Sequence, residues 1–323
     1  MKKFFIITLA VIVSIAFIFY FDYLFFRHMY RQSLGIAKSV EKYIQDECLY
    51  PSYFVKLKHF DDVYEIMKQK FRPIMNPNST KDSILIFGCS YAYGYVFDNK
   101  ETISYVLSKY SKRPIINRAY MGWGISHMLY QLRNDAELKN YNPKYIIYVV
   151  MDGSGHFERL CYTNFSDLYA EEYYYTYKLK NGELVENKPL FNLYYNLSLF
   201  RHIHNKFINK NVYNKFEKND EKLFDLFVKH FKTINAEIKK IWKDKDGNSP
   251  EFIILTFEGT KSEIWQEELE KEGIKVIDIS KTIGIENINE LEKGFFEPEI
   301  ASHPNGKLWK ELVPKLKEMY PDL

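Results

Sequence analysis

Ser90 is the residue of this sequence best placed to act as a nucleophile. It follows the apolar run of residues 83–87, which is typical of a short buried strand, and Gly88 and Gly94 permit tight turns on either side. In a parallel sheet, ligands bind beyond the carboxyl ends of the strands. Free backbone N–H groups in such a turn stabilise an oxyanion. The segment therefore predicts acyl chemistry, provided that a base activates the hydroxyl.

His303 is the candidate base. It lies after the last predicted strand and directly before a predicted helix, and the following Pro304 suits the first turn of that helix. Taken alone, each residue is better explained by structure, Ser90 as a helix cap and His303 as a helix start. Together with residues 117–124, a glycine-containing segment after the second predicted strand, they favour an active site over two unrelated caps.

Two other motifs carry weaker signals. Cys89 precedes Ser90, and because its side chain should point the opposite way, we expect it to be buried as an apolar residue. His202 and His204 share one face of an extended segment, but no cysteine or acidic cluster accompanies them. We predict no metal site.

Three segments together resemble the SGNH (GDSL-like) hydrolase family. Residues 88–94 are similar to its first motif, with Cys89 in the place of the usual aspartate. Residues 117–124 resemble its second motif, and Gly122 stands where the family's glycine donates to the oxyanion hole. Residues 303–305 resemble its last motif, whose histidine is the general base. The resemblance implies that the backbone N–H groups of Ser90 and Gly122 hold the oxyanion.

The third motif of the family departs from this pattern. It usually carries an asparagine that completes the oxyanion hole, whereas residues 151–156 contain none. Asp152 and His156 are the residues that we expect to take its place, unless the third donor is missing. His156 fits a structural role equally well.

The carboxylate of the triad also departs from the family pattern. The family places an aspartate three residues before the histidine, and Ile300 occupies that position. We predict that Glu299, or alternatively Glu297, orients His303. A Ser–His dyad without an orienting acid is the third alternative.

The resemblance implies a serine esterase that removes a small acyl group, such as acetyl, from a cell-envelope glycan or a similar ester, without metal or cofactor. The same triad serves an O-acyltransferase acting on an envelope polysaccharide, because the acceptor alone decides between the two reactions. A non-catalytic envelope-assembly protein that retains the fold is the other alternative. Ile300 and the missing asparagine support that reading.

The elements that must position these residues alternate along the chain. Five short apolar segments have the character of strands, and five amphipathic segments have the spacing of helices. This alternation predicts a three-layer α/β/α, flavodoxin-like domain with a five-stranded parallel sheet. A hairpin that turns at Asn181-Gly182 is expected within an insertion at about residues 157–220. The predicted strands are 83–87, 114–117, 145–151, 251–257 and 274–279, and the predicted helices are 102–110, 126–138, 221–242, 261–272 and 305–320.

The chain has 323 residues, and its N-terminus reads as a membrane anchor. Residues 4–21 are 18 residues without a charge, preceded by two lysines and followed by bulky aromatics rather than a cleavage site. We predict an uncleaved transmembrane signal anchor over residues 1–27, which leaves the catalytic domain extracytoplasmic. A helical stalk over 28–80 and a hydrolase domain over 81–323 would follow. The net charge of +3 gives no reason to expect nucleic-acid binding.

Overall fold

A computed structural model describes most of the predicted hydrolase domain and part of the chain before it. The chain divides into two compact units, and the larger comprises residues 65–162, 174–187 and 212–323. The described residues are 8, 10–11, 13–18, 20–21, 24, 64, 68–79, 82–94, 97–151, 156–157, 160, 177–186, 215, 217–243, 248–257, 260–285, 288–297 and 303–323.

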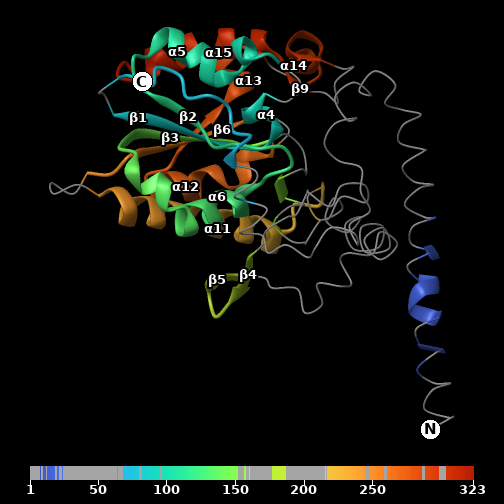
Figure 1. The fold of residues 1–323 in the computed structure, drawn as a ribbon. Helices are drawn as coiled ribbons and strands as arrows, with labels where there is room; N and C mark the ends of the chain where they lie inside the picture. Colours follow the sequence, from blue (N-terminus) through green and yellow to red (C-terminus); the bar gives the residue numbers. More distant parts are fainter. Residues whose placement is uncertain are drawn as a thin grey trace. The chain divides into compact units, whose positions relative to one another are not determined.

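The larger unit is built on a five-stranded parallel sheet, as predicted (Figure 1). Its strands stand in the order β2-β1-β3-β6-β7. The chain places β2 on one side of β1 and then crosses to the other side for β3, so the strand order reverses between β1 and β3. In open α/β sheets, ligands bind at such a switch point, at the carboxyl ends of the strands. The bounds are β1 (Ser83–Gly88), β2 (Ile115–Asn117), β3 (Pro143–Val149), β6 (Glu251–Thr256) and β7 (Lys275–Asp278).

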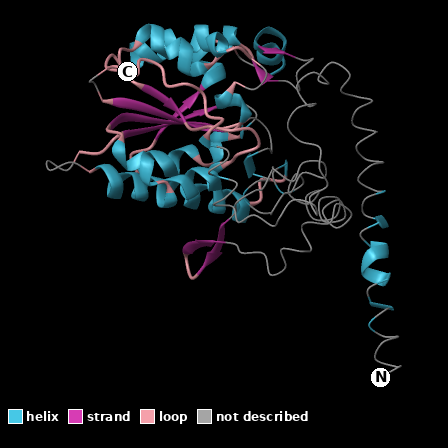
Figure 2. Cartoon of the chain, viewed as in Figure 1, coloured by secondary structure: helices cyan, strands magenta, loops and turns pink. Residues whose placement is uncertain are grey.

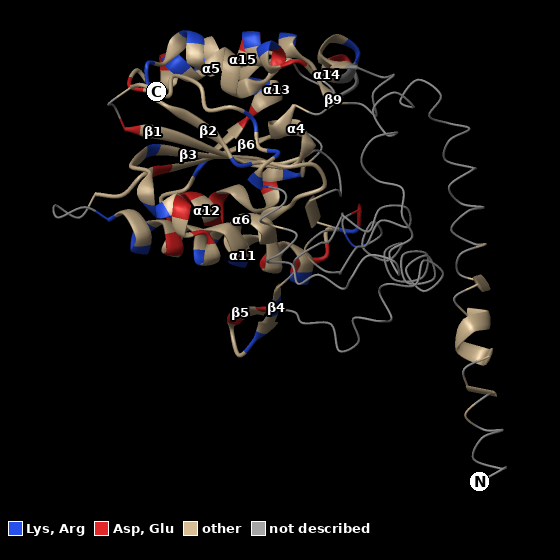
Figure 3. Cartoon of the chain, viewed as in Figure 1, with Lys and Arg blue, Asp and Glu red and all other residues tan. Residues whose placement is uncertain are grey.

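Helices cover both faces of the sheet (Figure 2). One layer contains α5 (Ile103–Tyr110), α13 (Ile279–Ile283), α14 (Ile288–Phe295) and α15 (Gly306–Met319). The other contains α6 (Ile125–Asn134), α11 (Glu221–Trp242) and α12 (Gln266–Lys271). Charged residues are far more frequent in these helices than in the strands between them (Figure 3), as expected for a sheet buried on both faces.

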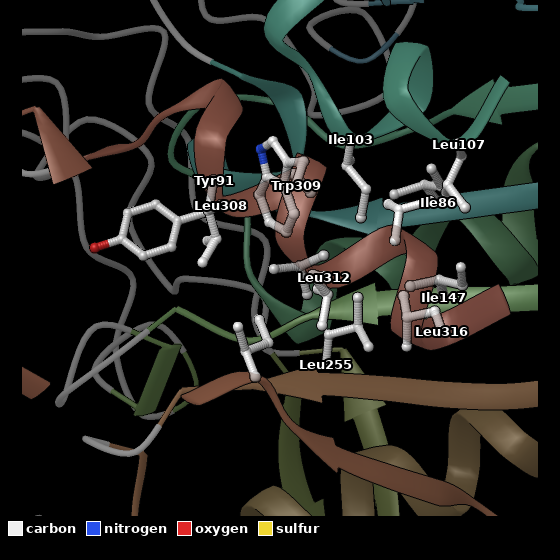
Figure 4. Close-up of a cluster of buried hydrophobic side chains, with 14 of the residues drawn as sticks. Ile86, Tyr91, Ile103, Leu107, Ile147, Leu255, Leu308, Trp309, Leu312 and Leu316 are labelled. Carbon is white, nitrogen blue, oxygen red and sulfur yellow. The ribbon is translucent and has the colours of Figure 1, made fainter. Parts of the chain in front are cut away.

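The core beneath the candidate nucleophile is shared by three strands, the helices α5 and α15, and Tyr91 (Figure 4). Side chains of β1, β3 and β6 meet the apolar faces of α5 and α15, and all of those labelled are at most 5% exposed. Packing on this scale fixes the height of α15 over the sheet, because close-packed interiors do not shift without cost. The labelled residues are Ile86, Tyr91, Ile103, Leu107, Ile147, Leu255, Leu308, Trp309, Leu312 and Leu316.

The predicted hairpin is confirmed by β4 (Tyr177–Lys180) and β5 (Glu183–Glu186), which pair in antiparallel register. Asn181 and Gly182 both have positive φ angles, of 52° and 78°. Both central residues of a type I′ turn need this conformation, which explains the Asn-Gly pair.

The helix predicted over residues 126–138 ends earlier than expected. Helix α6 stops at Asn134, and a 3-10 helix, η2 (Ala136–Asn140), follows. Asp135 causes the break: its side chain accepts from the Glu137 backbone N–H at 2.9 Å and lies 3.7 Å from the buried Arg118 guanidinium. A local cap and a long-range ion pair therefore override the helical pattern.

Residues 71–79, which precede β1, pack on the sheet unit. Met75 forms an antiparallel bridge with Ile115, the first residue of β2, through backbone hydrogen bonds of 3.1 and 2.9 Å. This bridge continues the hydrogen bonding of the sheet beyond β2. The chain before the predicted hydrolase domain therefore contributes to its edge.

The predicted anchor is described at scattered positions between residues 8 and 24, and these are helical. Within the parts of the chain that the structure describes, no helix combines the length and the apolar character needed to cross a bilayer. The signal anchor stays a prediction.

Candidate active site

Ser90 is the first residue of α4 (Ser90–Tyr93), a single turn of helix directly after β1. It therefore lies at the switch point of the sheet, and it is 9% exposed. Cys89 is the N-cap, and its thiol accepts from the Tyr91 backbone N–H at 3.5 Å. Cys89 is fully buried, as its predicted apolar role requires.

Glycines are required on both sides of this turn. Gly88 has a φ of +147°, and a Cβ atom there would lie 2.9 Å from both the Ala92 Cβ and the Val149 carbonyl oxygen. Gly94 has a φ of +76°, and a Cβ atom there would lie 2.6 Å from the Thr102 Cγ2. A side chain at either position would push α4 away from β3 or α5.

Asn117, at the carboxyl end of β2, holds α4 in place from the side. Its buried side-chain amide donates to the Ala92 carbonyl and to the Ser104 hydroxyl, both at 2.8 Å. Its Oδ1 accepts from the Ala119 backbone N–H at 3.0 Å. One side chain thus links α4, α5 and the loop that carries Gly122. The sequence marked Asn117 as the start of a motif without assigning it this role.

Gly122 lies in that loop, in the left-handed conformation with a φ of +74°. The Arg118 and Tyr120 backbone N–H groups donate to the Ile86 and Gly88 carbonyls of β1, at 2.7 and 3.4 Å. These bonds hold the loop at the same sheet edge as Ser90. The location fits the oxyanion role predicted for Gly122, which stays a prediction.

His303 reaches this edge from the far end of the chain. It lies in β9 (His303–Pro304), which pairs with β8 (Phe296–Glu297). The His303 ring packs against the ring of Tyr91, the neighbour of Ser90, with centroids 5.4 Å apart. Pro304 lies in this strand and not in the first turn of the closing helix as predicted: the helix begins at Gly306, and Asn305 caps it, its Oδ1 accepting from the Lys307 N–H at 3.0 Å.

Tyr91 is the centre of an aromatic group beside His303. Its ring meets those of Phe257 and Phe296 edge-on, with centroids 5.5 and 5.7 Å apart. These three residues come from α4, the end of β6 and β8. The group therefore ties the nucleophile turn to the strand pair that carries the histidine.

The other predicted site residues are only partly described. Glu299 and Asp152 lie outside the described residues, and of Glu297 the structure gives the backbone, which pairs directly opposite His303. His156 is fully buried, and its Nδ1 lies 3.4 Å from the Met151 backbone N–H and 3.2 Å from the Tyr148 hydroxyl. Because the backbone amide can only donate, Nδ1 acts as the acceptor. The oxyanion role of His156 stays a prediction.

Comparison with known proteins found no matching family model and no matching curated protein. Solved structures of low identity are similar. One is a member of the lipolytic protein G-D-S-L family from Veillonella parvula DSM 2008, with 13% identity and a TM-score of 0.39, covering 75% of this chain and 100% of that one. Another is Axe2, an acetylxylan esterase from Geobacillus stearothermophilus, with 10% identity and a TM-score of 0.39, covering 74% of this chain and 94% of that one.

Proposed function

We propose that this protein is a serine esterase of the SGNH type, with Ser90 as nucleophile and His303 as base. The observation that carries the proposal is the packing of the His303 ring against Tyr91, 5.4 Å between centroids, at the turn that begins with Ser90. Tyr91 and His303, more than two hundred positions apart, are thus in contact next to the switch point of the sheet, where α/β enzymes bind ligands.

The chemistry would run in two steps. The Ser90 hydroxyl oxygen attacks the ester carbonyl while the His303 imidazole takes its proton, and the imidazolium then gives that proton to the leaving alcohol. Water, deprotonated by the same imidazole, attacks the acyl-enzyme and releases the acid. Backbone N–H groups of Ser90 and Gly122 would bind the oxyanion in both tetrahedral intermediates.

Glu297 is the candidate for the orienting acid whose backbone the structure describes. It pairs directly opposite His303 in the β8–β9 register. Residues that face each other in an antiparallel pair project from the same face, with Cβ atoms about 5 Å apart. We propose that the Glu297 carboxylate accepts from the His303 imidazole N–H. Glu299 remains the alternative from the sequence.

The proposed substrate is an acyl ester, such as an acetyl ester, on an extracytoplasmic glycan. The motif resemblance supports the ester, and the N-terminal segment supports the location. Large apolar side chains at the described positions between residues 11 and 24 are 41 to 64% exposed. Exposed apolar surface of this kind marks a membrane or protein contact.

A fluorophosphonate probe tests the nucleophile, because it reacts only with an activated serine. We expect the wild-type protein to label and Ser90→Ala to be silent. Ser126→Ala is the control: Ser126 is a buried serine whose hydroxyl lies 3.4 Å from the Nε2 of His230, in the helical layer of α6 and α11. Labelling that survives Ser90→Ala would refute the assignment.

Acetate release separates hydrolysis from transfer. With an acetylated oligosaccharide and water as the acceptor, an esterase releases acetate at the rate at which the ester is consumed. Transfer to an added sugar without free acetate would identify the acyltransferase instead. A wild-type protein that neither labels nor turns over would favour the non-catalytic assembly protein.

A further inference from the structure

We propose that Arg72 is a positioning residue for the nucleophile, and that the segment Lys70-Phe71-Arg72, before the sheet begins, is part of the active-site scaffold. The inference rests on the proposed function. It extends the site to a part of the chain that the motifs do not include.

The Arg72 guanidinium donates hydrogen bonds to several backbone carbonyls that follow Ser90. Its Nε donates to the Tyr93 carbonyl at 3.0 Å, and its Nη2 donates to the Gly94 and Phe97 carbonyls at 2.5 and 3.0 Å. Its Nη1 donates to the Asn99 side-chain oxygen at 2.8 Å. The last carbonyls of any helix lack hydrogen-bond donors within the helix, and here the Arg72 side chain supplies the donors.

Helix α4 needs this outside support because it is only four residues long. A single helical turn is not stable by itself, because the entropy lost in fixing its backbone outweighs the hydrogen bond that it gains. Arg72 also lies over the Tyr93 ring, 4.5 Å from its centroid, and the Tyr93 hydroxyl donates to the Lys70 carbonyl at 3.1 Å. The ring and the hydroxyl of Tyr93 therefore both contact the segment Lys70-Phe71-Arg72.

Phe71 extends the contact to the loop of Gly122. Its ring meets the Trp123 ring edge-on, with centroids 5.7 Å apart, and Trp123 directly follows Gly122. The buried Arg118 guanidinium lies on Phe71, 5.1 Å from its centroid. Adjacent residues of one segment therefore contact the nucleophile turn and the proposed oxyanion loop, and fix the two relative to each other.

A positive charge alone at position 72 would not fix the nucleophile turn relative to the Gly122 loop. A guanidinium presents a planar fork that reaches several carbonyls at once, whereas the lysine ammonium is a single point on a flexible stem. Displacement of a reacting group by about 1 Å costs on the order of 100-fold in rate. We therefore expect Arg72→Ala to lower the rate of reaction at Ser90 by up to about 100-fold. The KM for a small ester should stay nearly unchanged.

Arg113 supplies the matched control. Its Nε donates to the Asp322 carbonyl at 2.9 Å and its Nη1 to the Asp82 carbonyl at 3.3 Å, so it too binds backbone. Asp82 immediately precedes β1, so this site lies at the opposite end of the strand from Ser90. Arg113→Ala removes fewer and more exposed hydrogen bonds than Arg72→Ala, and it should label at nearly the wild-type rate.

The test measures the rate constant of fluorophosphonate labelling, and kcat and KM for a small ester, in full-length wild type, Arg72→Ala, Arg72→Lys and Arg113→Ala. We expect slow labelling of both Arg72 variants, and partial recovery of Arg72→Ala when millimolar guanidinium is added. A folded Arg72→Ala that labels as fast as Arg113→Ala would overturn the inference. If Arg72→Ala does not fold, Arg72→Lys decides in the same way. Failure of the wild type to label would refute the proposed function instead.

Discussion

The side-chain amide of Asn117 donates to the backbone carbonyl of Ala92 across 2.8 Å, within the turn of helix that begins with Ser90. This contact joins β2 to α4 although 25 residues separate the two partners. Since Asn117 also binds Ser104 and the Ala119 N–H, its removal would leave three buried polar groups without their partner.

Asn117→Ala should therefore destabilise the fold by roughly 3 kcal/mol and slow labelling of Ser90, because unsatisfied buried groups cost about 1–3 kcal/mol each and part of the loss relaxes. Urea denaturation measures the first effect. Asn142→Ala is the control, because its amide donates to Asp82 at an exposed position. A change of under about 0.5 kcal/mol is expected there. Equal losses in the two variants would contradict the role of Asn117.

Gly94→Ala should cost more than its φ angle alone explains. Gly273 has nearly the same φ, +78°, and nothing within 4 Å of an added Cβ, so Gly273→Ala measures the backbone strain, about 1 kcal/mol. At Gly94 the methyl group also meets the Thr102 Cγ2.

Thr102→Ser removes that methyl but keeps the hydroxyl that caps α5 by accepting from the Tyr105 N–H. In a double-mutant cycle followed by thermal unfolding, Thr102→Ser should recover much of the loss caused by Gly94→Ala. Simple additivity would show that Thr102 is not the obstacle.

Glu297→Gln should lower kcat by up to about 10⁴-fold, the loss expected when an orienting carboxylate becomes an amide. Ester hydrolysis measures it, and Glu299→Gln should stay near wild type. The opposite pattern would assign the orienting role to Glu299. Wild-type rates in both would mean that His303 acts without a carboxylate.

His230 should make the fold sensitive to acid. Burial lowers its pKa to about 4 from 6.5, against the effect of the Leu226 carbonyl and with a smaller contribution from Arg133. Between pH 6.5 and about 4, the His230 side chain is protonated in the unfolded chain but neutral in the folded protein. The free energy of unfolding therefore decreases as the pH falls below about 6.5.

From pH 7.5 to pH 5 the loss should be roughly 2 kcal/mol. Urea denaturation at the two pH values measures it. His230→Gln, which cannot titrate, should lose that much less than wild type between them. Identical pH dependence in the two proteins would exclude His230 as the cause.

The sheet was predictable because each strand is a short apolar run bounded by glycine, proline or polar residues. Strands such as 145–149 are buried on both faces and therefore read as continuous apolar segments. The long helix predicted over residues 221–242 coincides with α11, since its apolar face and its Asp220 cap are both local signals. The position of Ser90 after the first strand followed from the same alternation, whereas His303 lies in β9, separated from the fifth strand by α13, α14 and β8.

What depends on distant partners was not predictable. Residues 28–80 were predicted as a helical stalk, yet Phe71 contacts the Gly122 loop and Arg72 binds α4, and both partners are distant in the sequence. The β8–β9 pair has two residues in each strand, too short for any periodicity to reveal. Its register places the Glu297 backbone opposite His303, a pairing that spacing along the chain does not reveal.

The order in which the parts of the site emerge during synthesis follows from where His303 lies. Ser90 comes directly after the first strand of the sheet, whereas His303 follows the last strand and is held between β8 and the closing helix α15. A nascent chain with all five strands released can complete its sheet while the serine still lacks a base. In the proposed enzyme, Ser90 would therefore gain its base only when α15, the last helix, docks onto α5.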